Sequence, residues 1–125
     1  MRYLIDTHLL VWWLNNDTRL PAKAKRIIAD SDHDIAISIA SVWEMSIKHA
    51  LGRLDVPDAF IAAIPAMPFA LLGITPNHAW YSAHLPPLHK DPFDRLLVAQ
   101  SRLEGRILLT VDQTLPEYGQ HIELV

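Results

Sequence analysis

Cysteine is absent from the chain of 125 residues, which excludes disulfides, thiolate-bound metals and thiol nucleophiles. A metal ion could therefore be held only by oxygen ligands or by imidazole nitrogen. The four glycines form neither of the loops, G-x-x-x-x-G-K-[ST] and G-x-G-x-x-G, that bind nucleotide phosphates. These two absences argue against cysteine-based catalysis and against a glycine-loop nucleotide site.

Long apolar runs are also missing. The longest apolar stretch, FIAAIPAMPFALLGI (60–74), is interrupted by Pro65 and Pro68 and is shorter than the about 20 residues that a membrane-spanning helix needs. The N-terminal sequence MRYLIDTHLL has Asp6 inside its only apolar run, which is unlike a signal peptide. We therefore expect a cytoplasmic protein with no membrane partner.

The chain has no excess of positive charge, since 11 Lys and Arg stand against 14 Asp and Glu. A net charge of −3 argues weakly against nucleic acid as a partner, because phosphate binding usually depends on Lys and Arg. If four of the acids surrounded a divalent cation, however, the rest of the chain would be slightly positive. Net charge therefore does not decide this question.

Half of the residues are hydrophobic, and the length suits one domain over residues 1–125. Apolar runs predict five strands, at 3–6, 35–39, 69–74, 107–111 and 122–125. Helical spacing predicts helices from about Thr7 and at 21–30, 41–54, 58–67, 77–85 and 92–105. Strands that alternate with helices and are continuously apolar indicate an α/β fold with a mostly parallel sheet covered on both faces. The last strand is expected at an edge.

Four acids stand at element boundaries: Asp6, Glu44, Asp94 and Asp112. Each has an ordinary structural explanation when it is taken alone. Asp6 ends the first strand and could cap the next helix, and Asp112 could fold back on its own turn. Glu44 stands three residues after Ser41, as in a capping box, while Asp94 would lie in the first turn of a helix capped by Asp91.

Taken together, the four acids predict a metal site. In a parallel α/β sheet the carboxyl ends of strands and the N-termini of helices share one edge, where ligands bind. Four carboxylates gathered there without cations would repel one another and raise their pKa values. Oxygen ligands without thiols favour Mg²⁺ or Mn²⁺. Such an ion could activate water for phosphodiester hydrolysis.

The same residues lie in motifs that resemble a known family. YLIDTHLLVWWL, SIASVWEMSIKHALGRL, HKDPFDRLLVAQSRLEG and ILLTVD, in this order, are similar to the successive motifs of the PIN-domain family, in particular its VapC-type toxins from type II toxin–antitoxin pairs. The resemblance covers residues 3 to about 118. DPFDRLLVAQ followed by a distal Thr-x-Asp makes it highly specific.

The resemblance implies a three-layer αβα domain with strand order 3-2-1-4-5. It implies an endoribonuclease that uses Mg²⁺ or Mn²⁺, arrests translation and growth by cleaving RNA, and is neutralised by a VapB-type antitoxin. It places the catalytic, metal-binding acids at Asp6, Glu44, Asp94 and Asp112. A homodimer that forms a larger complex with the antitoxin is also implied.

Other residues are candidates for contact with substrate or for ordering the site: Thr7, His8, Lys48, Asp91, Arg95 and Thr110. His89 could order the site as well, as imidazole can. Lys48 has a simpler role as the i, i+4 salt-bridge partner of Glu44. His78 is expected at the surface or at an interface, and Trp43 on the core-facing stripe of its helix.

Two alternatives come from other functional classes. A phosphoacceptor signalling domain would need a second acid after the first strand and a lysine after the fourth, and a phosphatase of the Asp-x-Asp type would need an acid at His8. Neither pattern is present. A catalytically inactive binding module with the same fold is the remaining alternative, and the intact set of four acids argues against it.

Overall fold

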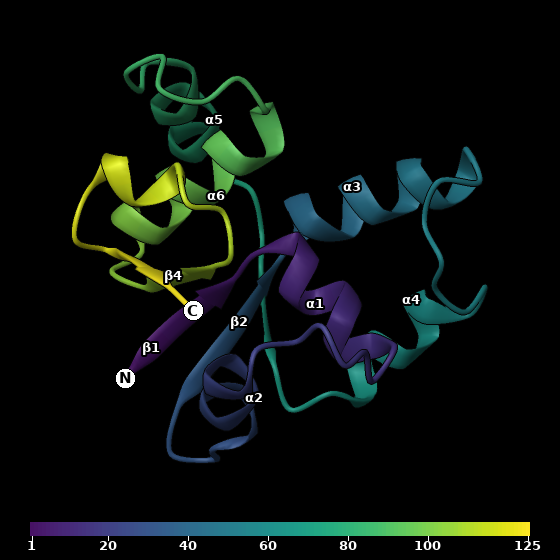
Figure 1. Cartoon of the computed structure of the whole chain (residues 1–125). Coiled ribbons are helices and arrows are strands. Elements are labelled where there is room, and N and C mark those ends of the chain that lie inside the picture. The colour runs from purple at the N-terminus through teal and green to yellow at the C-terminus, as the bar shows by residue number, and fades with distance from the viewer.

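A five-stranded parallel sheet forms the centre of the computed structural model, which describes residues 1–125 (Figure 1). The strands are β1 (Arg2–Ile5), β2 (Asp34–Ser38), β3 (Ala70–Leu72), β4 (Ile107–Thr110) and β5 (Ile122–Leu124). Their order is β3-β2-β1-β4-β5, and every neighbouring pair is parallel. The predicted fold class, strand order and edge position of the last strand are confirmed.

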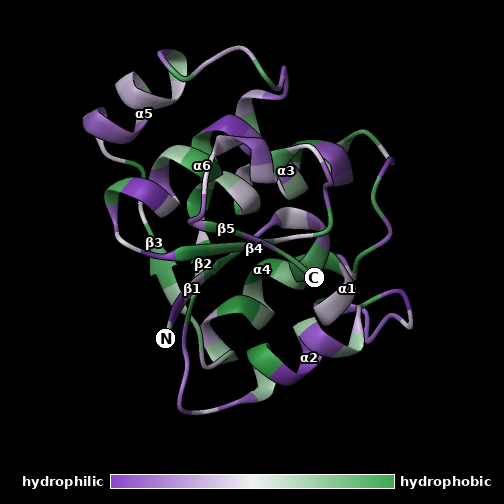
Figure 2. Ribbon diagram, turned by 60° about the vertical axis from the view of Figure 1, so that its left-hand side comes forward, coloured by the Kyte–Doolittle hydropathy of each residue, from purple (hydrophilic) through white to green (hydrophobic).

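Helices cover both faces of the sheet. They are α1 (Thr7–Leu14), α2 (Ala22–Ala29), α3 (Ile39–Ala50), α4 (Phe60–Ala63), α5 (Pro76–Ala83) and α6 (Pro92–Leu103), with 3₁₀ turns η1 (Ile64–Ala66) and η2 (Leu115–Tyr118). In Figure 2 the strands run between α6 on one side and α2 with α4 on the other. The fold therefore has three layers. From β1 the chain adds β2 and β3 on one side of the sheet and then β4 and β5 on the other, so the strand order switches between β1 and β4.

Side chains of β1 point alternately into two hydrophobic cores. Ile5 packs in one core with residues of α1, α2 and α4, whereas Leu4 packs in the other with residues of α6 and η2. Both side chains are fully buried, and burial of one such side chain stabilises the fold by about 1.5–3 kcal/mol. The central strand β1 is therefore held in place on both faces, which fixes the position of Asp6 at its carboxyl end.

The predicted helix at 41–54 is displaced toward the N-terminus. Helix α3 begins at Ile39, because β2 leads directly into it and the Ser38 hydroxyl accepts the Ala40 N–H (3.0 Å). The helix ends at Ala50, and Gly52 then adopts a left-handed φ of 69°, a conformation that favours glycine. Ser41 is thus inside the helix, and the capping-box prediction for Ser41 is wrong.

The prediction that Trp43 lies on the core-facing stripe of its helix is wrong as well. Trp43 is 57% exposed, and its ring contacts Phe93 edge-on with the centroids 5.2 Å apart. The buried residues of α3 are instead Ala40, Ser41, Glu44 and Met45. The helix therefore buries Met45 together with small and polar side chains, whereas Trp43 and Ile47 lie exposed on another side.

Two further predictions need correction. The helix expected at 58–67 is a short α4 followed by the 3₁₀ turn η1, because Pro65 has no N–H and its ring disrupts a continuing α-helix. His78 is 1% exposed rather than superficial. Its Nδ1 accepts the Thr75 N–H (3.0 Å) in a capping box, and its Nε2 lies 2.7 Å from Glu104. None of the helices combines the length and the apolar character that crossing a membrane requires.

Candidate functional site

The candidate site begins where β1 ends. Asp6 is the N-cap of α1, as predicted, and its Oδ1 accepts the Leu9 N–H (3.0 Å). Its Oδ2 accepts the hydroxyl of Thr110 (2.5 Å), which stands at the end of the neighbouring strand β4. Only 3% of Asp6 is exposed, and this burial raises its pKa although the hydrogen bonds from Thr110 and Leu9 oppose the shift. A buried carboxylate is thus held at the sheet edge.

Asp112 follows β4 and lies beside the same threonine. Its N–H donates to Thr110 Oγ1 (3.0 Å), and its Oδ1 accepts both the N–H and the hydroxyl of Thr114 (2.9 and 2.7 Å). This is the predicted turn. Burial opposes ionisation of Asp112, but the hydrogen bonds from Thr114 and His89 outweigh burial, so its pKa lies below the usual value. Asp112 is therefore an oriented anion.

Asp94 lies in the first turn of α6, as predicted. The N-cap is Asp91, whose Oδ1 accepts the N–H groups of Phe93 (2.8 Å) and Asp94 (3.2 Å). Burial, followed by the negative charges of Asp91, Glu44 and Asp6, raises the pKa of Asp94 to about 7 against an attraction from His89. The Asp94 carboxyl group therefore shares its surroundings with other acids.

Glu44 approaches the site from α3. It lies in the second turn of that helix rather than in the first, because α3 starts at Ile39. Glu44 is 4% exposed, and its Oε2 accepts a hydrogen bond from Lys48 (2.8 Å), the predicted i, i+4 pair. Its Oε1 is buried without any hydrogen-bond partner. A buried polar atom without a partner lowers the stability of a folded protein, and it is usually explained by a bound ion or water or by a catalytic role.

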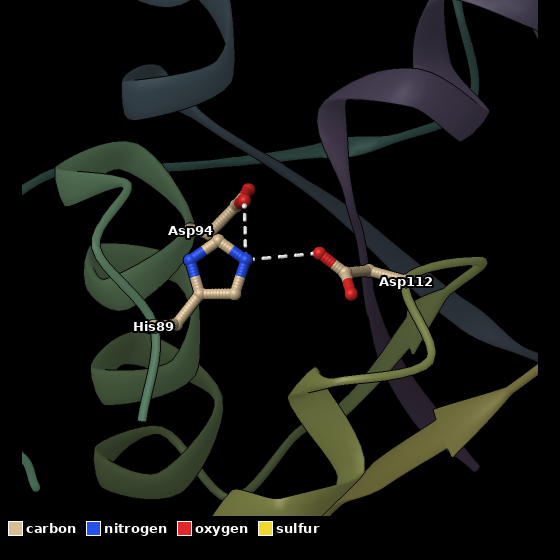
Figure 3. A group of neighbouring side chains, drawn as sticks. All are labelled: His89, Asp94 and Asp112. Atoms are coloured by element: carbon tan, nitrogen blue, oxygen red, sulfur yellow. Dashed lines mark hydrogen bonds and ion pairs between the residues drawn. The ribbon is translucent and has the colours of Figure 1, made fainter. Parts of the chain in front are cut away.

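His89 completes this cluster, although sequence reasoning did not place it among the ligands. Its Nε2 and carboxylate oxygens of Asp94 and Asp112 all lie within 4.8 Å of one another (Figure 3). In Figure 3 the imidazole stands between the two carboxylates, on the segment that leads into α6. The only signal in the sequence was its position two residues before the helix cap, in HKDPFD.

The donor set fits a hard divalent cation. Asp94 lies close to Asp112, no thiol is present, and burial, followed by the charges of Asp91, Glu44 and Asp6, disfavours the Asp94 anion. A cation of charge +2 would remove this repulsion. It would also give the orphaned Oε1 of Glu44 a partner. The residues that could hold the ion directly or through water are Asp6, Glu44, Asp94 and Asp112.

A cavity of about 600 Å³ adjoins the acids, with Thr7 and His8 in its wall. Trp12, Lys48 and Arg53 line it further out, and its volume is in the usual range for small-ligand sites. The acids themselves lie beside the cavity and do not line it. The lining has three cationic side chains and two acidic ones, Asp17 and Asp55, and its Lys48, Arg53 and Trp12 could contact a phosphate-containing ligand.

The remaining predicted site residues divide between packing and the cavity. The Thr7 hydroxyl donates to Ser41 Oγ (3.0 Å) and so ties α1 to α3, whereas His8 is exposed. Arg95 bonds backbone carbonyl groups, among them those of Pro86 (3.0 Å) and Leu85 (2.9 Å). These contacts give Arg95 a structural role in holding the segment that precedes α6, and its contact with substrate stays a prediction.

The comparison with protein families matches residues 3–120 to the PIN domain. The chain belongs to the PIN-domain family. Among curated proteins, this PIN domain is similar to Ribonuclease VapC22 of Mycobacterium tuberculosis (strain ATCC 25618 / H37Rv). The two are 29% identical over 121 residues, which cover 90% of this chain and 88% of the relative.

Solved structures share the fold of this PIN domain. A toxin–antitoxin complex from Klebsiella pneumoniae contains a chain with a TM-score of 0.70 and 18% identity, and the match covers 97% of this chain and 95% of the other. VapBC2 from Rickettsia felis, bound to a DNA fragment from its promoter, gives a TM-score of 0.71 at 15% identity and coverage of 100% and 98%. The family resemblance seen in the sequence is confirmed.

Proposed function

We propose that residues 1–125 form a single domain that acts as a metal-dependent endoribonuclease toxin. The observation that carries this proposal is that Asp94 lies close to Asp112 and that, after burial, the charges of Glu44 and Asp6 raise its pKa. Membership of the PIN-domain family and similarity to Ribonuclease VapC22 support RNA as the substrate.

The roles of the residues follow from their contacts. Asp6, Glu44, Asp94 and Asp112 would hold Mg²⁺ or Mn²⁺, which would supply an activated water and neutralise charge on the attacked phosphate. Thr110 fixes Asp6 through its hydroxyl. The Lys48 ammonium bonds Glu44, is 42% exposed and borders the adjoining cavity, which supports a contact between Lys48 and an RNA phosphate.

The proposal includes a protein partner. A chain of similar fold occurs in a toxin–antitoxin complex and another in VapBC2, which supports a cognate antitoxin of VapB type that blocks the acidic site. A homodimer that joins the antitoxin in a larger complex follows from the same family resemblance. Cleavage of RNA needed for translation, with growth arrest as its consequence, is the proposed outcome in the cell.

Purified protein incubated with single-stranded RNA tests the activity directly. We expect cleavage with Mg²⁺ or Mn²⁺, no cleavage after EDTA, and recovery when the metal is restored. Asp6→Ala and Asp94→Asn should lose at least 100-fold in rate while keeping the far-UV circular dichroism of the parent. Asp32→Asn, in an exposed turn, is the matched control. Equal cleavage by Asp94→Asn and the parent would refute the four-acid site and leave the inactive binding module.

A further inference from the structure

His89 stands between two of the proposed metal ligands. Its Nε2 lies 2.9 Å from Asp112 Oδ2 and 3.5 Å from Asp94 Oδ2 (Figure 3). Its side chain is 17% exposed. An imidazole in this place can act in two ways, since it can give its own lone pair to the ion or donate an N–H to the carboxylates.

The other ring nitrogen distinguishes these two roles. His89 Nδ1 accepts the backbone N–H of Asp91 at 3.2 Å. A backbone N–H can only donate, so Nδ1 must present its lone pair, and the proton of the neutral ring is on Nε2. That N–H points to Asp112 Oδ2, at a distance typical of a hydrogen bond.

Coordination through Nε2 would require the opposite tautomer. The proton would then be on Nδ1, where it would face the Asp91 N–H donor across 3.2 Å. Two donors in that geometry repel, and the Asp91 N–H would lose its acceptor. The backbone at the start of α6 therefore selects the tautomer that donates to Asp112.

The main chain of His89 is fixed as well. Its N–H donates to the Tyr118 hydroxyl (3.0 Å), and its carbonyl accepts from Arg95 (3.2 Å). The Tyr118 hydroxyl in turn donates to Pro86 O (2.8 Å). A residue held at its N–H, its carbonyl and its Nδ1 has little freedom to turn its ring.

We propose that His89 is a positioning residue that orients Asp112 through an Nε2–H hydrogen bond and does not coordinate the ion. The inference rests on the proposed function, because it assumes a metal at the four acids. Asp112 Oδ1 accepts two hydrogen bonds from Thr114 and Oδ2 accepts one from His89, so the second lone pair of Oδ2 stays available for the ion. Residues that orient metal ligands in this way typically change metal affinity or activity by 10–100-fold when they are lost.

Two substitutions test whether the N–H group at the position of Nε2, rather than the imidazole ring, is what Asp112 requires. In His89→Gln the amide nitrogen reaches roughly the place of Nε2, whereas in His89→Asn it reaches only that of Nδ1. Calorimetric titration of EDTA-treated protein with Mn²⁺ should show about 10–100-fold weaker binding for His89→Asn and near-parental binding for His89→Gln. Equal affinities of parent and His89→Asn would overturn the proposal.

Nitrogen NMR gives a readout that general damage to the fold would not produce. In protein labelled with ¹⁵N-histidine, we expect His89 to show a protonated Nε2 and an unprotonated Nδ1, both without metal and with saturating Mg²⁺. With Mn²⁺, electron spin echo spectra should show no coupling to a directly bound nitrogen of His89. A proton on Nδ1, or a bound nitrogen that disappears in His89→Gln, would make His89 a ligand and refute the proposal.

The outcomes also separate this proposal from the proposed function. If the parent binds Mn²⁺ and cleaves RNA, and Asp94→Asn does neither, the function holds whatever His89 does. A parental result for His89→Asn in that setting removes the positioning role alone. If the parent binds no metal at all, both the function and the positioning role fail.

Discussion

Replacing Asp94 by Asn should stabilise the metal-free protein at alkaline pH. The pKa of Asp94 is raised from an ordinary value of 3.8 to about 7, first by burial and then by Asp91 and Glu44. Its side chain is 19% exposed, so solvent screens it little. One pKa unit corresponds to about 1.4 kcal/mol, so ionised Asp94 lowers the free energy of unfolding by roughly 4 kcal/mol as an upper bound.

The pH dependence has a definite sign. Below pH 4 the carboxyl group is protonated in both the folded and the unfolded chain, so Asp94 has no effect. Between pH 4 and about 7 the unfolded chain releases the proton while the folded chain keeps it, so stability falls as the pH rises. Above about 7 both states are ionised, and the full penalty remains.

Urea denaturation of EDTA-treated protein between pH 4 and pH 8.5 measures this effect. The advantage of Asp94→Asn over the parent should be small at pH 4 and should approach its maximum above pH 7. Addition of Mn²⁺ should offset most of this advantage, because an ion at 100 times its Kd stabilises the parent by about 2.7 kcal/mol. The variant should gain much less.

Asp32→Asn serves as the control, because Asp32 is exposed in the turn between α2 and β2 and should show the pH profile of the parent. If the free energy of unfolding of metal-free Asp94→Asn equals that of the parent at every pH, burial and the neighbouring acids do not raise the pKa of Asp94. The electrostatic reasoning for the site then fails. A stabilisation by Mn²⁺ equal in variant and parent would count against Asp94 as a ligand.

Three further substitutions test other parts of the structure. Thr110→Val removes the hydroxyl that fixes Asp6 and should weaken Mn²⁺ binding about 10-fold by calorimetry, with Thr110→Ser near the parent; equal affinity for Thr110→Val would contradict this role. Arg106, 8% exposed, bonds the carboxylate of Asp34, so Arg106→Ala should lower the unfolding free energy by about 2–3 kcal/mol in urea without changing Mn²⁺ affinity. Gly105 has a φ of 63°, and a Cβ added there would meet no other atom within 4 Å, so Gly105→Ala should destabilise by about 1 kcal/mol through the left-handed backbone alone, and an unchanged midpoint would show that this backbone relaxes.

The elements that the sequence predicted well are those set by local, strong signals. Apolar runs marked all five strands, and the alternation of strands with helices indicated a parallel sheet. The caps at Asp6 and Asp91 were also predictable, because an Asp before a helix has an N–H to accept within its own turn. Once the sheet is parallel, these local features place the acids at one edge, whereas the strand order came from family resemblance.

The predictions that failed depend on which face of a helix is buried and on contacts between residues far apart in the sequence. The buried face of α3 is decided by its packing against the rest of the fold, which leaves Trp43 exposed beside Phe93. His78 is buried because Glu104, remote in sequence, offers it a partner. The His89 tautomer likewise depends on how the loop before α6 folds back. The hydrophobic periodicity of the sequence does not predict such contacts.

At the start of α6 the helix cap, Asp91, and a proposed metal ligand, Asp94, lie within one turn of each other. Asp91→Asn tests whether Asp91 contributes to helix stability alone. Asn caps helices about as well as Asp, so the helix should persist, and the Asp91 backbone N–H should still hold His89. Removal of the Asp91 charge, which follows burial among the causes of the raised Asp94 pKa, should move that pKa below 7 in a carboxyl-carbon NMR titration. RNA cleavage at saturating Mn²⁺ should persist, whereas Asp91→Ala should lose about 1 kcal/mol of stability with the cap. Loss of cleavage in Asp91→Asn without loss of structure would mean that Asp91 is itself one of the metal-binding acids.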